Sequence, residues 1–85
     1  MNISKHEQRV LHLLAQGGAI HFRRLSNGKV SHVTCFTRDG HVLTDCTLKI
    51  FDRLRKRRFI KSTNGLPYRV TRTGLRAGNA QQDNR

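Results

Sequence analysis

Two cysteines, Cys35 and Cys46, are the residues in this sequence best suited to chemistry. They lie eleven positions apart, a spacing that matches neither a Cys-x-x-Cys pair nor a zinc knuckle. With His32 and His41 they could supply the four nitrogen and sulfur ligands that zinc prefers, and a disulfide is a second alternative. In a cytoplasmic chain the pattern favours free, buried thiols that pack as small apolar residues.

The other polar residues form no catalytic motif. Cysteine nucleophiles need a thiolate held against an imidazole and a third, orienting group, and the five acids are not paired for general acid–base work. The glycines form no phosphate-binding loop. His21 and His32 fall on the two arms of an expected hairpin, where solvent-facing strand positions account for them. We therefore expect no catalytic residue, no metal, no cofactor and no enzymatic activity.

Positive charge is the strongest signal in the composition. Seventeen lysines and arginines oppose five acids, so the formal net charge is +12. Residues 49–61 hold seven of these cations and one acid, which is a local charge of +6. Charge gathered on one segment favours a polyanionic partner over a face that only keeps the protein in solution. The candidate partner- or nucleic-acid-binding residues are Lys49, Arg53, Lys56, Arg57, Arg58, Lys61 and Arg69.

A helix and a hairpin are expected to position these cations. Asp45 or Thr47 can cap a helix whose apolar stripe is formed by Leu48, Phe51 and Leu54. Short strands are expected at residues 59–62 and 68–70, joined by an Asn-Gly turn at 64 and 65. A basic helix that runs directly into a two-stranded hairpin is typical of a winged helix.

The first half of the chain is predicted to have a structural role. Ser4 and Glu7 fit a capping box, an apolar stripe follows at residues 10–14, and Gly17-Gly18 ends this helix. Residues 19–43 read as a β-hairpin that turns at Asn27-Gly28, followed by a short third strand or a short helix. The predicted fold is α+β and winged-helix-like, in the order α-β-β-(β or short α)-α-β-β. We assign residues 1–75 to this domain and residues 76–85 to a polar tail that frays.

The size of the chain restricts its function. Eighty-five residues form one domain with a small core, and the low aromatic content disfavours a deep small-molecule pocket. No apolar run is long enough to span a membrane, and the first residues do not resemble a secretory signal. We expect a cytoplasmic protein without a membrane partner.

Four strings resemble the YjhX-type family of small bacterial proteins: TCFTRDG, LTDCTLKIF, IKSTNGLPYRVTRTGL and the terminal QQDNR. The similarity extends from the first helix to Arg85. The resemblance implies a toxin of a toxin–antitoxin pair that binds DNA topoisomerase I, inhibits relaxation of negatively supercoiled DNA, and is neutralised by a cognate antitoxin. It assigns no role to individual residues.

The basic segment leaves other interpretations open. The same residues could bind DNA directly as part of a winged-helix transcription regulator, or they could dock on a protein that handles DNA. An inhibitor that imitates DNA would need an acidic surface, and this chain carries the opposite sign of charge.

Overall fold

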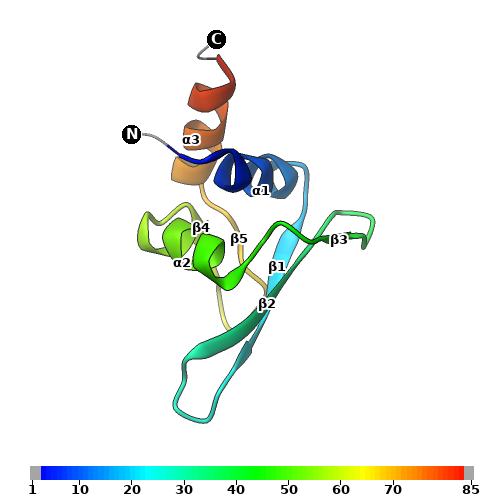
Figure 1. The fold of residues 1–85 in the computed structure, drawn as a ribbon, viewed down its shortest axis with the longest axis vertical. Coiled ribbons are helices and arrows are strands. Elements are labelled where there is room, and N and C mark those ends of the chain that lie inside the picture. Colours follow the sequence, from blue (N-terminus) through cyan, green and yellow to red (C-terminus); the bar gives the residue numbers. More distant parts are fainter. Residues whose placement is uncertain (1–2, 84–85) are drawn as a thin grey trace.

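The computed structural model describes residues 3–83, and the side chains of residues 3–78. Three helices and two small antiparallel sheets make up the fold, which confirms the α+β class (Figure 1). The elements are α1 (Lys5–Ala15), β1 (Ala19–Arg24), β2 (Val30–Phe36), β3 (Val42–Leu43), α2 (Leu48–Lys56), β4 (Ile60–Lys61), β5 (Arg69–Val70) and α3 (Arg72–Asp83).

The predicted capping box begins α1. The Glu7 amide donates to Ser4 Oγ at 3.1 Å, and the Ser4 amide donates to Glu7 Oε1 at 3.2 Å, so two N–H groups that the helix leaves unpaired are satisfied. Val10, Leu11 and Leu14 are buried on one face. The helix ends as predicted before Gly17, whose φ of +103° is unfavourable for other residues.

The first sheet has the order β1-β2-β3, so residues 42 and 43 form the short third strand rather than a helix. In the β1–β2 hairpin, Ile20 lies opposite Cys35 and Phe22 lies opposite Val33, and this face packs on the core. The Ile20 amide also donates to the carbonyl of Tyr68 at 2.9 Å. This bridge joins β1 to the segment that leads into β5.

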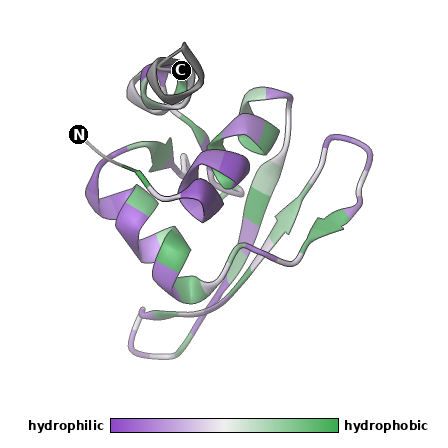
Figure 2. Cartoon of the chain, turned by 45° about the horizontal axis from the view of Figure 1, so that its top comes forward, coloured by the Kyte–Doolittle hydropathy of each residue, from purple (hydrophilic) through white to green (hydrophobic). Residues whose placement is uncertain are grey.

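Helix α2 runs directly into the β4–β5 hairpin, as predicted, and this arrangement is compatible with a winged helix. The sheet β1-β2-β3 occupies the interval where a plain winged helix would have a second helix. The core lies between these parts, where Leu11, Phe51 and Leu54 are completely buried and the rings of Phe51 and Tyr68 meet edge to face at 4.8 Å. Figure 2 shows that the connecting loops are mostly hydrophilic, whereas α1 and α2 each carry both kinds of residue.

The element order expected from the sequence omits α3. Residues 76–83, expected to fray, belong to this helix, and residues 84 and 85 lie outside the described part. Thr71 begins α3, since its Oγ1 accepts a hydrogen bond from the Gly74 amide at 3.1 Å. A Cβ at Gly74 would lie 2.2 Å from the Phe59 carbonyl oxygen, so glycine allows this helix to pack closely. Within residues 3–83, no helix has the length and apolar character needed to cross a membrane.

Candidate partner-binding surface

Helix α2 carries the first group of candidate cations. Its N-cap is Thr47, one of the two expected, whose Oγ1 accepts a hydrogen bond from the Ile50 amide at 3.2 Å. Ile50, Phe51 and Leu54 are its buried residues. The prediction that Leu48 belongs to the apolar stripe was wrong. Leu48 is 38% exposed, whereas Ile50 is buried beside Phe51 and Leu54.

The outward face of α2 is basic, as expected. Lys49, Arg53 and Lys56 are exposed, and their spacing of four and three residues places them on one side of the helix. Among the described residues, no acid forms an ion pair with Lys49 or Lys56. These two lysines, near the two ends of α2, are therefore available to a partner.

Two other candidates, Arg53 and Arg57, face an acid inside the fold. Arg53 Nη1 lies 3.7 Å from Glu7 Oε1, and Arg57 Nη1 lies 3.8 Å from Glu7 Oε2. The Glu7 side chain is only 2% exposed, whereas those of Arg53 and Arg57 are 49% and 34% exposed. A buried carboxylate requires such compensation. These arginines consequently attach α2 to α1 and also present part of their guanidinium groups to solvent.

Most of the acidic side chains in this protein form ion pairs within the fold. Besides Glu7, Asp45 accepts from Arg9, and Asp52 accepts from Arg55 at 3.2 Å. Arg55 also lies over the Phe51 ring at 5.8 Å. Since Lys and Arg outnumber Asp and Glu by seventeen to five, the pairing leaves a large unmatched positive surface.

Arg58 connects α2 to the β4–β5 hairpin in a conformation that favours glycine. Its φ is +61°. Its amide donates to the Arg55 carbonyl at 3.0 Å, and the Phe59 amide donates to the Leu54 carbonyl at 3.0 Å, which is the Schellman pattern of a helix C-terminus. A non-glycine residue here strains the backbone by about 1 kcal/mol, yet the position carries an exposed arginine.

We predict that Arg58→Gly raises the free energy of unfolding by about 1 kcal/mol, because glycine adopts positive φ without strain. Urea denaturation followed by circular dichroism measures the change. Arg58→Ala is the matched control, since it removes the same charge and keeps the strain. Equal stabilisation by both variants would show that charge repulsion, rather than backbone strain, is relieved.

The β4–β5 hairpin carries the last two candidates. Lys61 lies directly opposite Arg69, and both are exposed. Asn64 and Gly65 form the turn with φ values of +55° and +75°, as their residue types predict. Like charges placed opposite each other on a hairpin destabilise it, and a bound anion would remove that repulsion.

The structure divides the seven candidates into two groups. Lys49, Arg53 and Lys56 belong to α2, and Arg57 and Arg58 follow at its C-terminus. Lys61 and Arg69 belong to the β4–β5 hairpin. Arg69 lines a shallow hollow with His21, Phe36 and Arg38 from the first sheet and the turn after it. The sequence did not indicate that Arg69 lies beside these residues, because the bridge between β1 and Tyr68 that brings the segments together joins positions far apart in the chain.

The cysteines lie in the core and not at this surface. Cys35 and Cys46 are free and buried, as predicted. Within the described residues, no three His, Cys, Asp or Glu side chains are grouped so that they could hold a metal ion. The hydrogen bond with Cys35, together with burial, raises the pKa of the Cys46 thiol. A protonated, buried thiol is a poor nucleophile.

We therefore predict that iodoacetamide does not modify Cys46 in the folded protein at neutral pH, and modifies both cysteines once guanidinium unfolds it. Mass spectrometry counts the added groups. Thr63→Cys supplies an exposed reference thiol in the β4–β5 turn. Modification of Cys46 at a rate comparable to that reference would contradict the buried arrangement.

Comparison with known proteins places the chain in a family. A family model described as "Putative toxin of bacterial toxin-antitoxin pair" matches residues 1–85. The chain is 56% identical to a UPF0386 protein of Beijerinckia indica and 58% identical to one of Parvibaculum lavamentivorans, with all of each chain covered in both cases. It is 54% identical to a UPF0386 protein of Caulobacter vibrioides, covering all of this chain and 93% of that protein. No solved structure matches it.

The match to the toxin model is not confined to one motif, because it includes α1, both sheets, α2 and α3. The curated relatives have the same extent and about half of their residues in common with this chain. The chain belongs to the YjhX toxin family, the toxins of bacterial toxin–antitoxin pairs, and membership implies a cognate antitoxin as a partner.

Proposed function

We propose that this toxin binds DNA topoisomerase I and inhibits relaxation of negatively supercoiled DNA, with the basic residues of α2 and the β4–β5 hairpin forming the contact. The resemblance of the sequence to the YjhX-type family supplies the target. The observation that supports the contact surface is the set of exposed cations without an acidic partner among the described residues: Lys49, Lys56, Arg58, Lys61 and Arg69.

The sign of the charge restricts the mode of inhibition. An inhibitor that occupied the DNA-binding groove of a topoisomerase would meet a positive surface, and the net charge of +12 opposes that. Two modes remain, in which the basic surface docks on an acidic region of the enzyme or contacts the DNA that the enzyme holds. In both, the toxin acts by stoichiometric binding and not by catalysis.

A plasmid relaxation assay tests the proposal. Purified toxin added to topoisomerase I should suppress relaxation at about stoichiometric amounts, and tagged toxin should retain the enzyme from lysate that has been treated with nuclease. If relaxation continues at a large excess of folded toxin, the proposed target is wrong. If capture is lost only after nuclease treatment, DNA bridges the two proteins.

A second candidate function is direct regulation of transcription by binding duplex DNA. The observation that favours it is α2, a basic helix that continues directly into a hairpin, as in winged-helix proteins. A regulator of this kind should retard duplex DNA without topoisomerase, with an affinity that falls steeply as salt concentration rises. It should leave relaxation unchanged at concentrations too low to coat the plasmid.

A further inference from the structure

The outer face of the β1–β2 hairpin carries aromatic and cationic side chains that packing of the core does not explain. In the register of the two strands, His21 lies opposite Thr34 and Arg23 lies opposite His32. Strand alternation places Phe36 on the same face, while Ile20 and Cys35 point into the core. His21, Arg23 and His32 are exposed, and Thr34 and Phe36 are half-buried.

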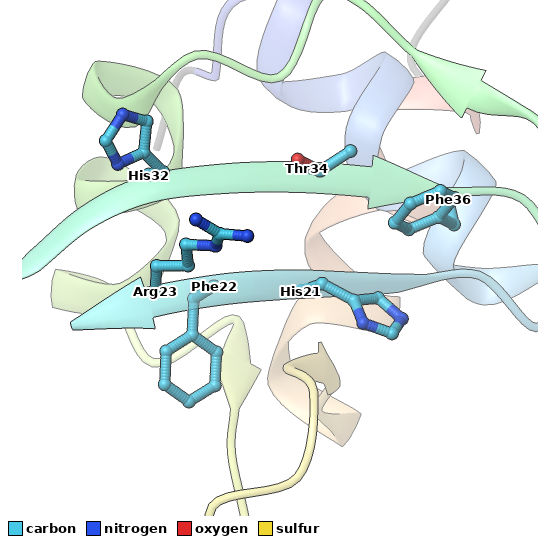
Figure 3. Close-up of a pocket in the computed structure, with 6 residues that line it drawn as sticks. All are labelled: His21, Phe22, Arg23, His32, Thr34 and Phe36. Carbon is cyan, nitrogen blue, oxygen red and sulfur yellow. The ribbon is translucent and has the colours of Figure 1, made fainter.

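Three rings lie on this face. Figure 3 shows His21 and Phe36 together at one end of the strands, with His32 and Arg23 towards the other. The centroids of the His21 and Phe36 rings are 4.8 Å apart in an edge-to-face arrangement. Rings spaced along an exposed sheet are the feature on which nucleic-acid bases stack in single-strand-binding proteins.

Positive charge surrounds the rings. The hollow that includes Arg23 and His32 shares His21 and Phe36 with a second one, which contains Arg38 and Arg69, and no carboxylate lines either. In the sequence, no acidic residue occurs between Glu7 and Asp39. The face therefore matches a polyanion in sign, and its rings offer that polyanion a second kind of contact.

We propose that the outer face of the β1–β2 hairpin is a binding site for single-stranded nucleic acid. Phe36, His21 and His32 stack against bases, and Arg23, Arg38 and Arg69 contact the phosphates. A duplex fits this site poorly, because its bases are already stacked on one another and present only their edges. The site shares Arg69 with the proposed topoisomerase contact, but it is separate from the outward face of α2, and it does not depend on inhibition of topoisomerase.

The experiment measures the fluorescence anisotropy of a short labelled oligothymidylate and of a duplex of equal length, each titrated with the intact toxin. We expect tighter binding to the single strand. Phe36→Leu should weaken that binding by about tenfold, because it keeps the apolar volume and removes the ring. Phe36→Tyr keeps the ring and should bind like the wild type.

Further variants separate ring stacking from charge. His32→Ala alters an exposed position where folding is not at issue and should weaken single-strand binding severalfold. Arg23→Gln should lower affinity more than Arg76→Gln, which removes the same charge from α3, at the opposite end of the molecule from the hairpin tip (Figure 1).

Several results would overturn the proposal. The proposal is wrong if the toxin does not bind the oligothymidylate, or if it binds single strand and duplex with equal affinity. It is also wrong if Phe36→Leu and His32→Ala both keep the wild-type affinity, or if the two arginine variants lose affinity equally. A further contrary result is displacement of the oligothymidylate by polyglutamate as effectively as by unlabelled strand. The last result would indicate an acidic protein as the partner. Topoisomerase inhibition measured on the same variants reports separately on the proposed function.

Discussion

Replacing Lys49, Lys56 and Arg58 together by glutamate should raise the toxin concentration needed for half-inhibition of topoisomerase I by about a hundredfold. These three cations are exposed and have no acidic partner among the described residues, so their replacement breaks no ion pair within the fold. Each reversal turns an attraction for an acidic or phosphate-bearing partner into a repulsion. The relaxation assay measures the loss, and circular dichroism checks folding.

A control with the same change in net charge distinguishes a local surface from bulk charge. Lys5, Arg72 and Arg76 are exposed cations on α1 and α3, and reversing all three also lowers the net charge from +12 to +6. We expect this control to inhibit nearly as well as the wild type. If both triple variants lose inhibition equally, the contact belongs to the overall field of the protein and not to the end of α2.

Glu7→Ala should lower the free energy of unfolding by about 2–3 kcal/mol, which for a domain of this size lowers the melting temperature by roughly 10–20 °C. The carboxylate accepts from the Ser4 amide and lies within 4 Å of Arg53 and Arg57. The substitution removes the capping acceptor, leaves both arginines without their anion, and opens a small cavity. Exposure of the arginines screens part of the electrostatic loss.

Glu7→Gln separates the two contributions. Glutamine keeps the shape and the capping acceptor but not the charge, so we expect it to cost about 1 kcal/mol. Gln8→Ala, one residue further along α1, is the control for helix propensity and should change stability by less than about 0.5 kcal/mol. Thermal unfolding monitored by circular dichroism measures all three. A loss for Glu7→Ala no larger than that for Gln8→Ala would mean that Arg53 and Arg57 do not depend on this carboxylate.

The two predictions concern two groups of cations on α2 and at its C-terminus. Arg53 and Arg57 use part of their charge to hold α2 against α1, so they support the surface as well as contribute to it. Lys49, Lys56 and Arg58 lie at the surface and form no ion pair that stabilises the fold among the described residues. A charge reversal that included Arg53 or Arg57 would combine loss of stability with loss of binding, and the two effects could not be separated.

Local signals in the sequence determined the elements of this protein. The capping box at Ser4 and Glu7, the threonine cap of α2 and the positive-φ turn at Asn64 and Gly65 each depend on residues within four positions, so each can be read from the chain alone. The α+β class followed from these signals and from periodicity. The excess of Lys and Arg over acids is a property of composition, and it required no structure.

Tertiary structure decided which side chains act together. Glu7 and Arg53 are separated by forty-six positions, and only packing of α1 beside α2 brings them together. Helix α3 includes residues 76–83, which the sequence predicted to fray, and its Gly74 lies so close to the Phe59 carbonyl that there is no room for a Cβ. The bridge from β1 to Tyr68 places Arg69 beside His21 and Phe36. Such contacts depend on the positions of whole elements, and no local pattern of residues encodes them.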